Sequence, residues 1–232
     1  MNIDVTQQEV IGNISILKLP VKGYRKLSKT KLLYTNIKRV LDLILSIIGA
    51  IVLLPVFILI AIAIKIESKG PAIFKHTRIG KDGKVIKIYK FRTMVNNAED
   101  MIKNFTIDQQ KEFKQNYKLK NDPRITKIGK ILRNTSLDEL PQIFNIIKGD
   151  LSIIGPRPVI EEELKKYEEN IEKFLSVTPG LTGYWAANGR SSTTYEQRMQ
   201  MELYYIDNMS FMMDVKVFFK TILSVLKKEG AV

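Results

Sequence analysis

The sequence predicts a mainly α-helical protein with one small β-hairpin, held at a membrane by a hydrophobic N-terminal helix. Three observations support this fold class. Residues 43–64 form an uninterrupted run without a charged side chain. Two β-rich runs flank the turn sequence at 80–83, which is typical of a hairpin. In most of the remaining chain, apolar residues recur at three- and four-residue spacing, which favours helices.

The amino-acid composition excludes several kinds of chemistry. The chain has 232 residues and 45% of them are hydrophobic, so neither disorder nor a low-complexity repeat describes it. It contains no cysteine, which excludes disulfides, cysteine-bound zinc and thiol nucleophiles. His76 is the only histidine, which excludes a multi-histidine metal centre. The net charge of +13 points to an anionic partner: nucleic acid, a phosphate-bearing small molecule or a lipid surface.

The hydrophobic run 43–64 is long enough to be a membrane helix, because about 20 apolar residues cross a bilayer. Pro55 lies near its middle and predicts a kink, since proline lacks an N–H and clashes with the preceding turn. Both flanks are basic: residues 18–39 carry eight basic and no acidic side chains, and five further cations follow between 65 and 81. Basic flanks mark the cytoplasmic side. A single pass and a helix that bends at Pro55 and returns are therefore both open.

The chain divides into three predicted segments: a basic N-terminal arm (1–36), a membrane helix (37–66) and a cytosolic domain resting on the membrane interface (67–232). The lysines of the arm are expected to hold it to anionic lipid. At the start of the membrane helix, Asp42 is expected to pair with Lys38 or Arg39 at helical spacing, at the level of the lipid headgroups.

Local patterns predict the elements of the cytosolic domain. The first run of the hairpin ends at Arg78, and the second begins at Val85. Helices are expected over 97–120, from Asp122, and over 136–148, 160–174, 195–208 and 212–228, and loops over 151–158 and 178–192. Thr193-x-x-Glu196 has the pattern of a capping box. The last helix is either a core helix with a solvated face or an amphipathic helix lying in the membrane interface.

The strongest candidates for chemistry are the adjacent carboxylates Asp138 and Glu139. Neighbouring side chains on a helix point about 100° apart, which suits separate roles better than joint binding of one ligand. Their repulsion is expected to raise one pKa, which suits a proton acceptor beside an ionised nucleophile. A structural alternative stays open, because Ser136-x-x-Glu139 also has the pattern of a capping box at a helix start.

Cations are expected to surround these two acids. Pro156 and Pro158 restrict the backbone around Arg157, and a guanidinium held in this way suits bidentate binding of phosphate. A turn with an exposed arginine is the alternative. Further candidates are Arg78, Lys90, Arg92 and Arg124. Each alone is more simply a solvated charge, but together they would form a cationic pocket around two acids, as phosphoryl chemistry with a divalent metal requires.

Several ordered motifs make the chain resemble the bacterial sugar transferases, the monotopic phosphoglycosyl transferases, from about Ile37 to the C-terminus. One such motif would be weak, but their number and order are specific. The motifs are Lys38-Arg39-x-x-Asp42, Lys90-Phe-Arg-Thr-Met94, Ser136-Leu-Asp-Glu-Leu-Pro-Gln142, Lys148-Gly-Asp-Leu-Ser152, Gly155-Pro-Arg-Pro158, and Pro179-Gly-Leu-Thr-Gly183 followed by Asn188-Gly-Arg190.

The resemblance implies a function and a location. Enzymes of this family transfer a sugar 1-phosphate from a UDP-sugar to undecaprenyl phosphate, giving a polyprenyl-diphospho-sugar and UMP, with Mg²⁺ as cofactor. This is the first membrane step in the assembly of exopolysaccharide, capsule or another glycan. The resemblance also implies a helix that enters the bacterial inner membrane and returns, which leaves both termini and the catalytic domain on the cytoplasmic face.

The resemblance further implies roles for single residues. Asp138 would attack the β-phosphate and form an aspartyl phospho-sugar intermediate, with the metal at the same residue, and Glu139 would assist the lipid phosphate in the second half-reaction. By position, the phosphate-binding cations would be Arg133, Arg157, Lys90, Arg92 and Arg78. Asn188 and Arg190 lie in a loop that would contact the nucleotide or the sugar.

Two departures from the family pattern are visible. The family breaks its membrane helix at a Ser-Pro pair, whereas this chain has Leu54-Pro55, so the break depends on Pro55 and its surroundings. The family's Gly-Trp pair corresponds here to Gly183-Tyr184-Trp185. The N-terminal arm has no counterpart in the family pattern.

A non-enzymatic alternative is a basic, membrane-tethered scaffold that binds anionic lipid or a partner protein. Nucleic-acid binding is not expected, because the aromatic residues are not interleaved with basic ones on one face. The residue types select neither the donor sugar nor the oligomeric state, so a homodimer stays an open alternative.

Overall fold

The computed structural model describes residues 29–116, 119, 121–189 and 193–227. Residues 1–28 of the predicted arm and Arg190 of the predicted loop lie outside the described residues. The described part is mostly helical and contains two small two-stranded sheets. It therefore confirms the mainly α-helical prediction with its hairpin, and adds a second sheet that the sequence did not predict.

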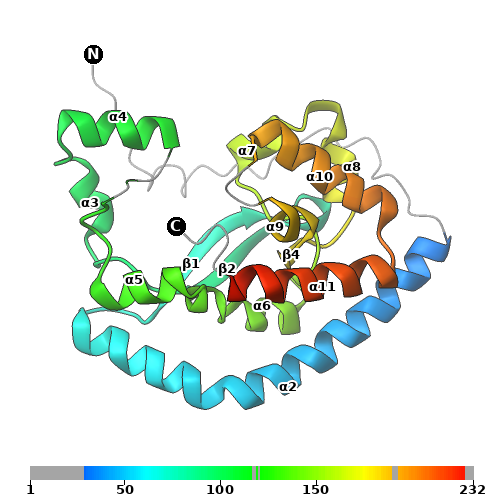
Figure 1. Cartoon of the computed structure of the whole chain (residues 1–232), viewed down its shortest axis with the longest axis horizontal. Helices are drawn as coiled ribbons and strands as arrows, with labels where there is room; N and C mark the ends of the chain where they lie inside the picture. The colour runs from blue at the N-terminus through cyan, green and yellow to red at the C-terminus, as the bar shows by residue number, and fades with distance from the viewer. Residues whose placement is uncertain (1–28, 117–118, 120, 190–192, 228–232) are drawn as a thin grey trace.

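The predicted membrane helix corresponds to α2 (Lys29–Glu67), which extends beyond the hydrophobic run at both ends and continues through Pro55. If straight, its 39 residues would measure about 58 Å, since each residue adds 1.5 Å. Figure 1 shows α2 as a bowed helix along one side of the molecule, with the other elements on its concave side. Among the described residues, it is the one helix that is long and apolar enough to cross a membrane.

The outer face of α2 is apolar and exposed. Ile51 is 69% exposed and Leu59 is 67% exposed, whereas the face toward the rest of the protein buries Phe57 and Ile64. Apolar side chains gain free energy when they leave water, and large exposed apolar patches mark membrane or protein contacts. The exposed apolar face of α2 fits the predicted association with a membrane.

The hairpin consists of β1 (Ile73–Ile79) and β2 (Val85–Phe91), which pair antiparallel. The register places Ile73 opposite Phe91 and Ile79 opposite Val85. A single turn of 3-10 helix at Lys81–Gly83 joins the strands, and both Asp82 (φ 56°) and Gly83 (φ 72°) have left-handed backbone there. Asp and Gly are among the residues that tolerate this conformation, so the turn sequence predicted the hairpin correctly.

The second sheet pairs β3 (Ser152–Ile154) in parallel with β4 (Gly180–Thr182). Both strands lie in segments that were expected to be loops. They are only three residues long, which is too short for an alternating pattern to be visible in the sequence. The two backbones approach so closely that a Cβ atom at Gly180 would lie 2.1 Å from the Gly155 nitrogen. Glycine at these two positions therefore allows the contact that holds the Gly155–Pro158 loop beside the sheet.

The other helices of the described residues are mostly short. They are α3 (Ala98–Ile102), α4 (Ile107–Asn116), α5 (Lys127–Asn134), α6 (Gln142–Lys148), α7 (Glu161–Lys165), α8 (Ile171–Leu175), α9 (Tyr184–Asn188), α10 (Tyr195–Asn208) and α11 (Phe211–Leu226). The single helix expected over 160–174 is divided into α7 and α8. The helix expected to begin at Asp122 begins instead at α5, because the Thr126 hydroxyl accepts a hydrogen bond from the Gly129 N–H and caps it there.

The capping box expected at Thr193 and Glu196 is displaced by one residue. Thr194 is the N-cap of α10, its hydroxyl accepts from the Gln197 N–H, and the Gln197 side chain accepts from the Thr194 N–H. The motif recurs in adjacent registers of this segment, so the sequence alone did not select between them. The helix itself was predicted with its observed bounds.

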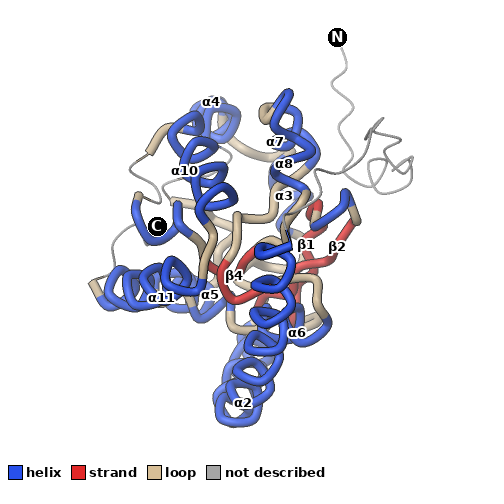
Figure 2. The backbone as a smooth tube through the Cα atoms, turned by 90° about the vertical axis from the view of Figure 1, so that its right-hand side faces the viewer, coloured by secondary structure: helices blue, strands red, loops and turns tan. Residues whose placement is uncertain are grey.

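Three hydrophobic cores hold these elements together, and the smallest joins Ile86 and Ile88 of the hairpin to Ile146 and Leu151. Figure 2 shows the strands between α2 on one side and α7, α8 and α10 on the other. On the latter side, the largest core includes the fully buried rings of Tyr167 and Tyr205. Beneath α2, a smaller core joins Phe57 and Ile64 to Phe91 of the hairpin. The hairpin therefore lies between the membrane helix and the main body.

The two ends of α2 are attached to the same body. Near its N-terminus, Lys31 donates to the Asp207 carbonyl oxygen at 2.7 Å, at the end of α10. Near its C-terminus, the Glu67 carboxylate accepts from the Lys127 N–H at 2.7 Å, at the start of α5. A carboxylate at a helix N-terminus is also favoured by the helix dipole. These contacts place the beginning and the end of the hydrophobic helix on one soluble unit.

The expected pairing of Asp42 with Lys38 or Arg39 is wrong. Asp42 is buried and accepts from the Ser152 hydroxyl at 2.6 Å. Lys38 instead contacts Asp214 at 2.5 Å, and Arg39 donates to backbone carbonyls at the end of α6. Helical spacing allows pairs within α2, but these three side chains find their partners in β3, α6 and α11, which are distant in sequence.

The last helix, α11, carries a broad exposed apolar face. Phe211, Met212 and Phe219 are each 60–62% exposed, whereas Asp214 and Val217 are buried against the body. This distribution differs from a core helix with a polar solvated face, because long apolar side chains occupy much of the outer surface. It is the pattern of a helix that lies on a membrane surface.

Candidate active site

The two adjacent acids lie on one turn of 3-10 helix, Leu137–Glu139, between α5 and α6. Ser136 precedes this turn with φ 56°, in the left-handed region, and its side chain makes no capping hydrogen bond. The capping-box interpretation of Ser136 and Glu139 is therefore wrong, and the regular helix begins only at Gln142. A left-handed non-glycine residue costs about 1–2 kcal/mol and such residues cluster at functional sites.

Lys90, near the end of β2, faces both acids. Its Nζ lies 2.6 Å from Glu139 Oε1 and 3.9 Å from Asp138 Oδ2. All three side chains are half-buried, so this charge cluster is partly screened by solvent. The structure thus brings together three of the residues that the sequence singled out.

Asn145 fixes the distance between the acids and the hairpin. Its side chain is fully buried, accepts from the Tyr89 N–H at 2.9 Å and donates to the Lys87 carbonyl oxygen at 2.8 Å. These two bonds attach α6 to strand β2. Because the acids directly precede α6 and Lys90 directly follows Tyr89, the Asn145 bonds determine how closely the opposite charges approach.

A polar pocket opens beside the acids. It brings Glu139 and Lys90 together with Arg78 of β1 and Arg157 of the Gly155–Pro158 loop. The full lining is His76, Arg78, Ile88, Lys90, Glu139, Gln142, Arg157, Pro158, Gly180 and Leu181. Four cationic or acidic groups that are distant in sequence therefore line one cavity, as the sequence predicted for a site that binds phosphate.

Burial shifts the pKa values of several groups at this site, among them Asp138 and His76. Burial raises the pKa of Asp138 above its usual value; Lys90 opposes the shift, Glu139 adds to it and Arg133 opposes it. The expected repulsion between the two acids is thus present, but burial is the larger cause. Burial, and to a smaller extent the nearby cations, lower the pKa of His76 to about 4, so the imidazole is neutral at pH 7.

The remaining predicted site residues lie at different distances from the pocket. Arg133 donates to the Thr93 hydroxyl at 2.9 Å and lies within electrostatic range of Asp138. Arg92 is buried and donates to the backbone carbonyls of residues 68 and 69, just after α2, so its described contacts are structural. The Asn188 amide contacts Lys220 of α11 and does not line the pocket.

A set of charged residues behind the pocket was not predicted from the sequence. Glu163 contacts Arg78 at 3.8 Å and Arg198 at 3.1 Å, and Glu202 accepts from the Arg157 N–H at 3.1 Å. Arg198 and Glu202 are four residues apart on a helix that was predicted correctly, so their spacing was a visible signal. Such pairs are commonly exposed on helix surfaces, whereas these two side chains are buried.

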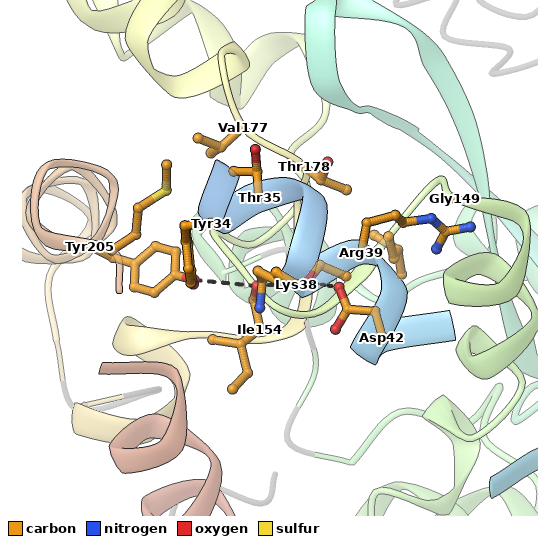
Figure 3. A pocket seen from close by; sticks show the side chains of 13 residues that line it. Tyr34, Thr35, Lys38, Arg39, Asp42, Gly149, Ile154, Val177, Thr178 and Tyr205 are labelled. Carbon is orange, nitrogen blue, oxygen red and sulfur yellow. Dashed lines mark hydrogen bonds between the residues drawn. The ribbon is translucent and has the colours of Figure 1, made fainter. Parts of the chain in front are cut away.

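A second pocket lies where α2 meets the body (Figure 3). In Figure 3, Tyr34, Lys38 and Asp42 lie on α2, Tyr205 approaches from α10, and Arg39 points toward Gly149. The cations here are occupied by internal partners, and Asp214 also accepts hydrogen bonds from the hydroxyls of Tyr34 and Tyr205. This pocket is therefore a junction between the membrane helix and the body, and we assign the chemistry to the pocket beside Asp138.

Mg²⁺ stays a prediction. The described ranges contain no group of three or more His, Asp or Glu side chains that could hold a metal ion. Mg²⁺ is, however, usually held by one or two carboxylates together with substrate phosphates and waters. The half-buried Asp138 carboxylate beside a cationic pocket fits such a site, in which most ligands come from the substrate.

Comparison with known proteins defines the class to which this site belongs. Residues 33–228 match the bacterial sugar transferase family, so the chain belongs to this family, as its motifs predicted. The undecaprenyl-phosphate galactose phosphotransferase of Salmonella typhimurium is 39% identical over 198 residues, which are 84% of this chain and 41% of that protein. The exopolysaccharide production protein ExoY of Sinorhizobium fredii is 40% identical over 197 residues, 84% of this chain and 87% of that protein.

A third relative is the UDP-glucose:undecaprenyl-phosphate glucose-1-phosphate transferase of Escherichia coli, 35% identical over 232 residues. These are 95% of this chain and 46% of that protein. The chain thus spans less than half the length of the Salmonella and Escherichia proteins, but most of the length of ExoY.

Proposed function

We propose that this protein transfers a sugar 1-phosphate from a UDP-sugar to undecaprenyl phosphate, as the first membrane step in the assembly of an exopolysaccharide, capsule or related glycan. The observation that carries this proposal is the Asp138–Glu139 pair facing Lys90 beside a pocket that contains Arg78 and Arg157. The names of the relatives support the same reaction class. Both substrates are anions, and the pocket supplies the cations that would bind their phosphates.

In the first step, a carboxylate oxygen of Asp138 attacks the β-phosphorus of the UDP-sugar. The bond between this phosphorus and the oxygen bridging to the α-phosphorus breaks, and UMP leaves with that oxygen. The product is an aspartyl phospho-sugar, in which the charge of the attacking carboxylate has been removed. Covalent capture divides one difficult displacement between two polyanions into two easier steps.

In the second step, a phosphate oxygen of undecaprenyl phosphate attacks the same phosphorus. The bond from phosphorus to the Asp138 oxygen breaks, which restores the carboxylate and yields the polyprenyl-diphospho-sugar. Glu139 accepts the proton of the attacking phosphate where that phosphate is still protonated. Lys90 lies 2.6 Å from Glu139 and stabilises its ionised form.

The cations of the pocket hold the donor. Arg78 and Arg157 bind its phosphates, and Arg133 stabilises negative charge at Asp138. Mg²⁺, bound by Asp138 together with the donor phosphates, would neutralise charge on the transferring phosphoryl group. His76 stays neutral in the same pocket, so its ring nitrogens can accept or donate hydrogen bonds without adding charge.

We further propose that α2 enters the cytoplasmic leaflet and returns, with both termini in the cytoplasm. The support is that Lys31 and Glu67 contact the same body through α10 and α5. A helix that crossed the roughly 30 Å hydrocarbon core would separate its two ends to opposite faces. The apolar face of α11 lies in the same interface and holds the pocket near the lipid-linked substrate.

The chain's lack of cysteine allows a direct test of this topology. Asn36→Cys and Lys69→Cys place a single thiol near either end of the hydrophobic run, and a membrane-impermeant maleimide reports which face each occupies. We expect both thiols to react from the cytoplasmic side of inverted vesicles and neither from the outer side of intact spheroplasts. Reaction of the two thiols from opposite sides would establish a single pass.

The activity is tested with the purified full chain, a panel of UDP-sugars and undecaprenyl phosphate in detergent or nanodiscs. We expect UMP release that depends on the lipid and on Mg²⁺ with at least one donor, and a phospho-sugar mass adduct on Asp138 when the lipid is omitted. Absence of turnover with every UDP-sugar would count against the proposal. It would favour the alternative of a membrane-tethered scaffold, whose vesicle binding is salt-sensitive and indifferent to nucleotide.

A further inference from the structure

Two arginines of the pocket are attached to one face of a single helix. Arg198 and Glu202 lie one turn apart on α10 (Tyr195–Asn208), behind the pocket wall. Arg198 Nη1 lies 3.1 Å from Glu163 Oε1, and Glu163 Oε2 lies 3.8 Å from Arg78 Nη1. The second of these distances is too long for a hydrogen bond but within the range of an ion pair, so Glu163 joins Arg198 to Arg78 electrostatically.

The other residue of this pair reaches the second pocket arginine. Glu202 Oε1 accepts from the Arg157 N–H at 3.1 Å, which fixes the backbone of the Gly155–Pro158 loop. The guanidinium groups of Arg157 and Arg198 also lie 5.9 and 4.8 Å from the ring centre of Trp185. Cations at such distances are attracted by an aromatic ring. Trp185 therefore attracts both arginines to one aromatic ring.

These supporting groups are buried at a cost to stability. Arg198 is 8% exposed and Glu202 is 1% exposed. Arg198 Nε and Nη2 and Glu202 Oε2 have no hydrogen-bond partner among the described residues. Burial raises the pKa of Glu202 to about 7, against the opposing effects of the Arg157 N–H and the two arginines. Buried charges with incomplete partners destabilise a fold, so a hydrophobic pair would be the more stable choice at these positions.

We propose that Arg198 and Glu202 are positioning residues for Arg78 and Arg157, which they hold in the orientation that binds the phosphates of the UDP-sugar. The proposal rests on the proposed function, because that function assigns the two pocket arginines to the donor. Arg198 acts through Glu163 on Arg78, and Glu202 acts through the backbone of Arg157. Neither residue lines the pocket, so both act on the donor through other residues in this proposal.

A double-mutant cycle tests the first part of the proposal, in which Arg198 acts through Glu163 on Arg78. Arg198→Met keeps an unbranched apolar chain in place of the arginine's aliphatic part and removes the charge. We expect it to raise KM for the UDP-sugar roughly tenfold while kcat changes by less than about threefold, because an orienting ion pair is lost. If Arg198 acts through Arg78, Arg198→Met has little further effect in an Arg78→Ala background. Arg198→Lys, which keeps a cation for Glu163, restores part of the affinity.

The matched control is Lys165→Met on α7, an exposed cation that contacts Glu161 rather than Glu163. It removes the same charge from a neighbouring surface and should leave KM unchanged. An unchanged KM in Arg198→Met, or effects of Arg198→Met and Arg78→Ala that simply multiply, would overturn the proposal. Where Arg198→Met does not fold, Glu163→Gln enters the same cycle and decides by the same criteria.

Glu202→Met tests the second part of the proposal, in which Glu202 acts through the backbone of Arg157. It separates a positioning role from a structural one. A structural role predicts a lower melting temperature with unchanged KM. Positioning predicts the reverse: KM for the UDP-sugar and the dissociation constant of UMP, measured by calorimetry, rise severalfold, while the melting temperature is kept or raised because a buried charge is gone. A wild type without turnover refutes the proposed function, whereas an active wild type with unaltered KM in this variant refutes only the positioning role.

Discussion

The acidic side of the pocket and its arginine side are built in different ways. Asp138 and Glu139 share one turn of chain, and the nearby strained backbone of Ser136 and the bonds of Asn145 aim them at the hairpin. The arginines come from β1 and from the loop after β3, and a third element, α10, holds both. The acids therefore share one short turn that is fixed to the hairpin, whereas the cations come from separate elements that a further helix joins.

This difference matters for the chemistry that each side would perform. A nucleophile must keep one position relative to the reacting phosphorus, and a short turn hydrogen-bonded to a strand gives little freedom. Phosphate-binding cations must follow a charge that moves from donor to product. Side chains held through ion pairs and an aromatic ring have more freedom to do so. The comparison predicts that changes on the acidic side reduce kcat, and changes on the arginine side raise KM.

The largest expected effect on this comparison comes from Asp138→Asn. It removes the proposed nucleophile and keeps the shape of the side chain, so we expect kcat to fall roughly a thousandfold or more, as for other covalent catalysts. Affinity for UMP should be kept, since Arg78 and Arg157 are unchanged. Rate and affinity are measured by UMP release and by calorimetry. The control Asp108→Asn alters an exposed acid of α4, and an equal loss of rate in both variants would contradict the assignment.

Asn145→Ala breaks the connection between α6 and β2. It leaves the Tyr89 N–H and the Lys87 carbonyl oxygen without their partner, so we expect a loss of about 1–3 kcal/mol in the free energy of unfolding. Because the variant also frees the acids from Lys90, kcat should fall more than KM rises. Denaturant unfolding and steady-state rates check the two effects. Asn208→Ala, at an exposed position of α10, is the control and should change neither.

The same contrast explains which features could be predicted from the sequence. The acid pair, the Gly155–Pro158 loop, the hairpin and the hydrophobic helix are all contained in short stretches of chain, and each was recognised. The parallel pairing of β3 and β4 and the partners of Asp42 join distant segments, and neither leaves a local pattern. Arg92 illustrates the converse: two residues after Lys90, it was expected on the same face of the strand and in the pocket. Strand β2 ends at Phe91, however, and the Arg92 guanidinium meets backbone carbonyls after α2.

A smaller effect, whose direction follows from the pKa of Asp138, is expected in the pH dependence of stability. A raised pKa means that native Asp138 binds its proton more tightly than the unfolded chain does. Its contribution to stability is therefore full below the ordinary pKa of 3.8 and is lost as the pH rises through the raised native value. We expect Asp138→Asn to melt at a higher temperature than the wild type at pH 7.5, and at the same temperature near pH 4. A variant that is less stable at pH 7.5 would show that the ionised acid is stabilised by its cations.

The smallest expected effect is on the free energy of unfolding of Ser136 variants. It tells whether Ser136 is a strained residue or caps the turn. If Ser136 capped the turn, Ser136→Ala would cost about 1 kcal/mol. The left-handed backbone and the lack of a capping bond predict instead that Ser136→Ala is nearly neutral, and that Ser136→Gly stabilises the fold by at most about 1 kcal/mol, because glycine adopts φ 56° without strain but loses more chain entropy on folding. Chemical unfolding of the three proteins decides between the two accounts. A marked loss in Ser136→Ala would restore the cap and remove the argument that this turn is strained to aim its acids at Lys90.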